Sequence, residues 1–132
     1  MLRQTQQNQL ADYIYIFGTI LFTIYGQLVL KWQVSQYGAL PSGMTEKAWF
    51  IARLLLNPWI ISGFASAFLA SLCWMAAMTK FELSRAYPFT SLSFVLILFL
   101  SAILFRESVT VPKILGMIFI VIGIIIGSQG YR

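Results

Sequence analysis

Long apolar stretches separated by short polar segments dominate this chain of 132 residues. Four of them approach the length of about 17 to 25 mainly apolar residues that crosses a bilayer as a helix. The predicted spans are Tyr13 to Leu30, Pro58 to Thr79, Tyr87 to Phe105 and Pro112 to Ser128. We therefore expect an all-α, four-span membrane protein with a four-helix transmembrane domain over residues 13–128, a flexible polar tail over 1–12 and a short tail over 129–132.

A shorter amphipathic segment lies between the first two spans. Its sequence, "TEKAWFIARLLLNP", begins with Thr45, a residue suited to an N-cap, and predicts a short helix at the membrane interface. Asn57 and Pro58 then start the second span, because proline fits the first turn of a helix better than its interior. The alternative is one long second helix that kinks at Pro58.

Composition supports a membrane protein and argues against several kinds of enzyme. The chain is 59% hydrophobic and only 10% charged, whereas soluble domains carry about a quarter charged residues. It has no histidine and one cysteine, Cys73, and its four acids are scattered: Asp12, Glu46, Glu82 and Glu107. We expect no metal site, no cofactor, no enzymatic activity and no nucleic-acid partner.

The positive charges are divided almost evenly between the two faces of the membrane. Four spans put both termini on one side, together with Arg3, Lys80, Arg85 and Arg132; the other side carries Lys31, Lys47, Arg53, Arg106 and Lys113. Four cations against five give no bias under the positive-inside rule. A mixed orientation, as in an antiparallel dimer, is therefore expected.

Small residues mark two helices as packing surfaces, since helices in lipid associate where their backbones approach closely. The second span has two rows at four-residue spacing, Ser62/Ser66/Ala70 and Gly63/Ala67/Ser71, which predict an interior helix. The fourth span contains "GIIIG", with Gly123 and Gly127 as a candidate dimer interface. The alternative for these two glycines is packing within one subunit.

A polar stripe runs along the first span. Its members recur every four residues and are Tyr15, Thr19, Thr23, Gln27 and Lys31. Polar groups at membrane depth usually face a bundle interior or a wet cavity, so the stripe predicts a groove that ends in a cation and suits a ligand with an anionic head. For Lys31 alone, the alternative is an anchor that reaches the interface from a helix end.

The start of the third span offers further candidate ligands. Arg85 and Tyr87 stand beside Pro88, which we expect to start this span. In the structural alternative, Arg85 is an anchor paired with Glu82 and Tyr87 belongs to the interfacial aromatic belt.

Two serines and one acid complete the candidates. Ser91 and Ser93 point to different faces, so at most one should line a groove shared with Gln27, and Ser91 is the preferred one. Glu107 is expected to form a local ion pair with Arg106 or to cap the fourth helix.

Several blocks of this sequence resemble the small multidrug resistance family of the drug/metabolite transporter superfamily. They are "TIYGQLVLKW", "LSRAYPFTSLSFVLILFLSAIL", "FRESVTVPKILG" and "GMIFIVIGIIIG". The G-Q-x-x-x-K of the first helix and the A-Y-P-x-x-S-L-S-F of the third look most like the subunits that flip aminoarabinose-phosphoundecaprenol. The resemblance implies a dimeric transporter of the bacterial inner membrane.

The departures from the drug-exporting branch concern two positions. Where those exporters carry a membrane-embedded glutamate this chain has Thr23, and where they carry a tryptophan it has Thr90. No predicted span holds a carboxylate that could exchange a proton for a lipophilic cation. Proton-coupled export of cationic drugs is therefore disfavoured.

Together these features predict a flippase or translocase for a polyprenyl-phosphate-linked sugar, built as a homodimer or with a related four-helix subunit. The predicted substrate-binding residues are Thr23, Gln27, Lys31, Arg85, Tyr87 and Ser91. The phosphodiester is placed near Lys31 and Arg85, and the lipid tail stays among the membrane lipids. The alternatives are a small-solute or drug exporter of the same superfamily and a non-transporting accessory subunit of a membrane glycosyltransferase.

Overall fold

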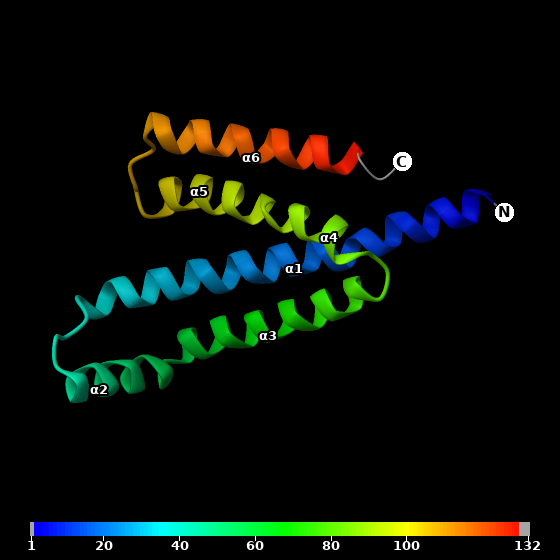
Figure 1. Cartoon of the computed structure of the whole chain (residues 1–132). Helices are drawn as coiled ribbons and strands as arrows, with labels where there is room; N and C mark the ends of the chain where they lie inside the picture. Colours follow the sequence, from blue (N-terminus) through cyan, green and yellow to red (C-terminus); the bar gives the residue numbers. More distant parts are fainter. Residues whose placement is uncertain (1, 130–132) are drawn as a thin grey trace.

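The computed structural model describes residues 2–129, and all the regular structure in them is helical. The helices are α1 (Leu2–Tyr37), α2 (Met44–Leu55), α3 (Pro58–Met78), α4 (Leu83–Thr90), α5 (Leu92–Leu104) and α6 (Val111–Gln129). They run roughly alongside one another, with α1 between α3 and the α4–α5 pair (Figure 1). The predicted all-α class is confirmed.

Four segments are long and apolar enough to cross a membrane, which confirms the predicted number of spans. They are Leu10–Tyr37, Pro58–Met78, Leu83–Leu104 and Val111–Gln129. The first span is longer than predicted at both ends. Helix α1 as a whole begins at Leu2 and so includes the segment that was expected to be a polar tail. The chain starts α1 and finishes α6 at the same end of the bundle, as an even number of spans requires (Figure 1).

The connection between α1 and α3 contains the predicted short helix, α2. Its N-cap position is Gly43, without a side-chain cap, so the assignment of Thr45 to that position is wrong. The chain leaves the helix at Leu56, and the Asn57 side chain accepts a hydrogen bond from the Trp59 amide at 2.9 Å. This cap, with Pro58 in the first turn, separates α2 from α3 and rules out one continuous kinked helix. The position of α2 at the membrane surface stays a prediction.

The third span is broken near its start. It begins at Leu83 and not at Pro88, which lies inside α4. Pro88 has no N–H to donate to the carbonyl four residues earlier, so the helix is weakened at this point. At the end of α4 the Ser91 amide donates to the Pro88 carbonyl at 3.1 Å, and α5 follows from Leu92.

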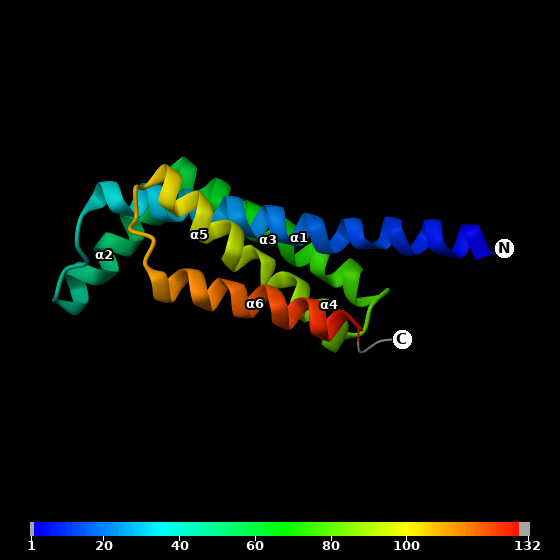
Figure 2. The same ribbon diagram turned by 90° about the horizontal axis from the view of Figure 1, so that it is seen from above.

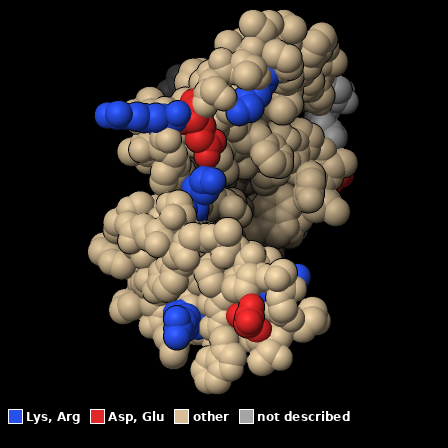
Figure 3. All heavy atoms as spheres, turned by 90° about the vertical axis from the view of Figure 1, so that its left-hand side faces the viewer, with Lys and Arg blue, Asp and Glu red and all other residues tan. Residues whose placement is uncertain are grey.

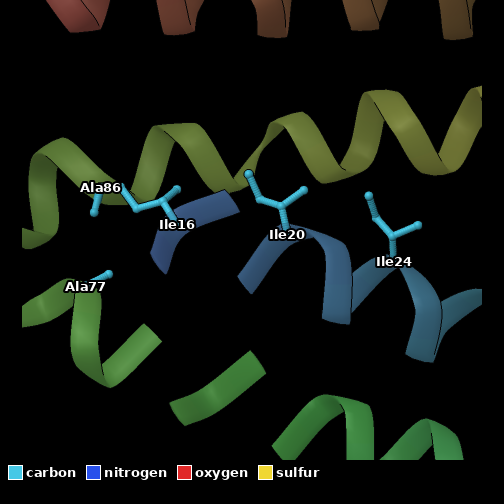
Figure 4. Close-up of a cluster of buried hydrophobic side chains, with 5 residues drawn as sticks. All are labelled: Ile16, Ile20, Ile24, Ala77 and Ala86. Atoms are coloured by element: carbon cyan, nitrogen blue, oxygen red, sulfur yellow. The ribbon is translucent and has the colours of Figure 1, made fainter. Parts of the chain in front are cut away.

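α1 and α3 pack through small residues of the rows on the second span, but α3 lies on the outer side of α1, so the prediction of an interior helix is wrong. A Cβ added to Gly26 would lie 3.1 Å from the Gly63 carbonyl oxygen, so the two backbones meet at this glycine pair. Ser66 of α3 donates to the Phe22 carbonyl of α1 at 2.7 Å. On its other side α1 presents Ile16, Ile20 and Ile24 toward α4 and α5, forming a buried cluster with Ala77 and Ala86 (Figure 4).

α6 is the helix least integrated into the bundle. It contacts α4 and α5, but none of its described residues is buried, and from above it stands clear of α3 (Figure 2). A Cβ added to Gly123 or Gly127 would meet no atom of the described chain within 4 Å. The alternative interpretation, in which these two glycines pack against another helix of the same subunit, is therefore wrong for residues 2–129.

Candidate functional site

A groove of about 650 Å³ lies between α1, α3 and the broken third span. Its polar lining consists of hydroxyl, phenol and amide side chains: Thr19, Thr23, Gln27, Ser71, Tyr87, Thr90 and Ser93. None of the residues that line it in the described chain is an Asp, Glu, Lys or Arg. The groove is therefore polar but carries no formal charge of its own.

The stripe on α1 supplies one wall of this groove. Thr19, Thr23 and Gln27 all line it, which agrees with the expectation of a polar cavity beside the first span. Thr19 also donates to the Tyr15 carbonyl at 2.8 Å, so its hydroxyl is held by its own helix. Among residues 2–129 the Gln27 amide has no hydrogen-bond partner, and it is thus available to a ligand in the groove.

Lys31 lies one turn beyond Gln27, past the end of the groove lining. Its Nζ is 3.6 Å from Oε1 of Glu107, in the connection between α5 and α6. The prediction that Glu107 would pair locally with Arg106 is therefore wrong. The side chains are 57% and 38% exposed, and a pair so accessible to solvent contributes at most about 1 kcal/mol. Figure 3 shows basic and acidic side chains adjoining at this end of the molecule.

The connection that carries Glu107 is shaped by two features. Arg106 adopts a positive φ of 53°, a conformation uncommon for a residue other than glycine, and this turns the chain directly before Glu107. Lys113 at the start of α6 donates to the Ser108 carbonyl at 2.9 Å. The connection therefore holds the carboxylate against the end of α1 although it has no regular structure.

Arg85 lies beside the opposite end of the α1 stripe. Its Nη2 donates to the Tyr13 hydroxyl at 3.2 Å, and the centre of its guanidinium is 5.9 Å from the centroid of the Phe81 ring. Tyr13 and Lys31 are about 27 Å apart along α1, given a rise of about 1.5 Å per residue. The expectation that Arg85 and Lys31 flank a single phosphodiester is therefore wrong in its geometry.

The third span contributes Tyr87 and one serine to the groove. The ring of Tyr87 stands edge-on to Trp74 with centroids 5.9 Å apart, and both residues line the groove. Ser93 also lines it, whereas Ser91 does not, so the preference for Ser91 is wrong. Tyr87, Thr90 and Ser93 follow one another at three-residue spacing on the face that lines the groove, and this spacing passes over Ser91.

Trp74 is a groove residue that the sequence interpretation missed. It lies three residues after Ser71 and seven after Ala67, on the same helix face as the row of small residues that faces the groove. The four-residue row continues to Met75, which also lines the groove, whereas Trp74 follows Ser71 at the three-residue spacing that shares the same helix face.

Comparison with known proteins gives one family and a set of close relatives. The sequence profile of the EamA-like transporter family matches residues 1–128. A protein of Aeromonas hydrophila subsp. hydrophila named "Probable 4-amino-4-deoxy-L-arabinose-phosphoundecaprenol flippase subunit ArnF" is 34% identical over 122 residues, covering 91% of this chain and 81% of that protein.

Two further proteins carry the same name. The one from Photorhabdus laumondii subsp. laumondii is 35% identical over 118 residues, covering 83% of this chain and 92% of its own. The one from Pseudomonas aeruginosa is 31% identical over 120 residues, covering 89% of this chain and 85% of that protein. No solved structure is significantly similar to the chain.

Proposed function

Because the chain belongs to the EamA-like transporter family, we propose that it is one subunit of a flippase for a polyprenyl-phosphate-linked sugar. It is a multi-pass protein of the bacterial inner membrane, with four helices able to span it. Relatives over most of its length are named flippase subunits for 4-amino-4-deoxy-L-arabinose-phosphoundecaprenol. A lipid of this class is the substrate that we assign to the groove.

The observation that carries the proposal is a neutral groove with a lysine just beyond its end. Hydroxyl and amide groups can replace the water around a sugar, and Lys31 can attract a phosphate. Among the described residues the lining holds no carboxylate, so a substrate that brings its own negative charge fits better than a cationic drug. The polyprenyl tail stays in the bilayer, and only the head group needs the polar path.

Glu107 gives Lys31 a counter-ion in the absence of substrate. A phosphodiester that enters beside Lys31 replaces this carboxylate as the partner of the ammonium group. Because the pair is exposed, separating it costs at most about 1 kcal/mol. A charge-assisted hydrogen bond of about 1.5 to 3 kcal/mol to the phosphate exceeds that cost.

The complete flippase contains a second subunit in this proposal, either identical or related. Gly123 and Gly127 of α6, where an added Cβ would meet no described atom within 4 Å, supply the contact, since small residues let two helices approach closely. Rocking of the two subunits about the groove then exposes it to either face in turn. The broken third span, with Tyr87 and Ser93 on either side of its break, is typical of transporter substrate sites.

Substitutions at Lys31 and Gln27 test this function in vesicles that contain the lipid-linked sugar. Lys31→Ala should abolish movement of the sugar and Lys31→Arg should retain part of it, because the charge remains while the geometry changes. Gln27→Leu should impair movement through the lost hydrogen bond. For a lysine that only anchors the helix, a lysine introduced in place of the exposed Ser35, one turn beyond Lys31, should restore activity to Lys31→Ala, and Gln27→Leu should be silent.

The same vesicles separate the alternative functions. Uptake of quaternary cations without movement of the lipid-linked sugar would identify a drug exporter. Co-purification with a glycosyltransferase, and no lipid movement by the isolated complex, would identify an accessory subunit.

A further inference from the structure

Two cationic side chains lie at opposite ends of one face of α1. Lys31 is on α1 itself, and Arg85 reaches the same helix through its hydrogen bond to Tyr13. Tyr13 and Lys31 are 18 residues apart, which is about five turns at 3.6 residues per turn, so their side chains leave the helix in the same direction. Their axial separation of about 27 Å approaches the thickness of the hydrocarbon core, about 30 Å.

The Arg85 end is an ordered group of side chains. The Tyr13 hydroxyl accepts from the guanidinium, and its ring packs against Phe81 and Phe89 with centroids 4.9 and 5.8 Å away. The Phe81 ring also lies within cation–π distance of Arg85. These contacts fix the orientation of a guanidinium, a group that matches a phosphate with two parallel hydrogen bonds.

The groove lies between these two ends. Its lining on α1 runs from Thr19 to Leu30, so Tyr13 precedes it by about 9 Å and Lys31 follows it directly. α4, which carries Arg85, is near the end with both termini, and the connection that carries Glu107 is at the other (Figure 1). The described lining of the groove is neutral, and the two cations lie beyond its opposite ends along α1.

We propose that Arg85, positioned by Tyr13, forms a second phosphate site on the opposite membrane face from Lys31. A phosphate-linked lipid is held by one cation before it crosses and by the other afterwards. The uncharged groove between them offers hydrogen bonds to the head group, and it holds no charge that would trap the phosphate at mid-membrane. This inference rests on the proposed flippase function and adds the location and number of its anion sites.

Counting bound phosphate tests the inference. The full chain, purified with any subunit that accompanies it, is placed in lipid nanodiscs, where both faces are accessible, and titrated with a radiolabelled short-chain isoprenyl-phosphate-linked sugar. Relative to the unaltered chain, Lys31→Ala and Arg85→Ala should each remove one bound probe per chain. The double variant should lose two bound probes per chain. The probe that remains with it measures the background from partition into the lipid.

Tyr13→Phe provides a variant that keeps the ring packing against Phe81 and Phe89. Without the hydroxyl, the affinity of the Arg85 site should fall about twofold to tenfold, the value of one net hydrogen bond, while the Lys31 site is unchanged. Arg85→Lys should restore part of the binding lost in Arg85→Ala. These variants keep the test valid even where Arg85→Ala fails to fold.

Four results would overturn the inference. Full probe binding by a folded Arg85→Ala protein, or full affinity in Tyr13→Phe, would remove the second site but leave the Lys31 site and the proposed function intact. Loss of the same single probe in both alanine variants would show one shared site. No specific binding to the unaltered chain, with no lipid movement in vesicles, would reject the proposed function itself.

Discussion

The close approach of α1 and α3 at Gly26 leads to a sharp prediction about stability. In Gly26→Ala the new methyl group lies 3.1 Å from the Gly63 carbonyl oxygen, a backbone atom that moves only if the helices separate. Overpacking of this kind costs about 1 to 3 kcal/mol. Alanine in place of glycine within a helix contributes about 1 kcal/mol in the other direction. The net change should lie between no effect and about 2 kcal/mol of destabilisation.

Gly63→Ala is the matched control, because its methyl group would lie 3.5 Å from the Gly26 carbonyl oxygen, an ordinary contact. Both variants gain the same helix propensity, so the difference between them isolates the steric cost of about 1 to 3 kcal/mol. Equilibrium unfolding in mixed micelles, followed by circular dichroism, measures both free energies. A Gly26→Ala protein as stable as Gly63→Ala would refute the tight backbone contact.

Three further predictions concern assembly, a helix cap and topology. Gly127→Leu should weaken subunit association in detergent, measured by analytical ultracentrifugation, while insertion is unchanged; unaltered association would reject the α6 contact. Asn57→Ala should destabilise the protein by about 1 kcal/mol by mixed-micelle unfolding, because it removes the α3 cap and the hydrogen bonds to Gln33 and Tyr37; an unchanged free energy would contradict these contacts. Accessibility labelling of tags on both termini should find them always on one side, in two populations of opposite orientation, whereas a single orientation would favour a heteromeric or parallel assembly.

Apolar length and small-residue spacing were sufficient to predict the four spans and the close packing of α3 on another helix, but not its place on the outer side of α1. Both depend on local sequence, because the bilayer sets the length of a span and close backbone approach requires small side chains. The boundaries of α1 were predicted less well. Gln, Leu and Ala are good helix formers, so the helix continues beyond the apolar run in which the span was recognised.

The errors at the site arise where distant segments meet. Glu107 pairs with Lys31, 76 positions earlier in the chain, and nothing near either residue encodes that contact. A single phosphodiester near both Arg85 and Lys31 was at odds with the span count, which places these cations on opposite membrane faces, and the rise of about 27 Å from Tyr13 to Lys31 agrees with that count. Ser93 lines the groove because it continues the three-residue spacing of Tyr87 and Thr90 along the third span.

Native mass spectrometry of the complex, purified from its own membrane, tests the central claim most directly. The proposed flippase should retain a polyprenyl-phosphate-linked sugar, identified by its mass, and Lys31→Ala should retain it about tenfold to a hundredfold less, as expected for the loss of one charge-assisted hydrogen bond. Retention of bulk phospholipids alone by the unaltered complex, or equal retention of the lipid-linked sugar by the Lys31→Ala protein, would contradict a phosphate site at Lys31.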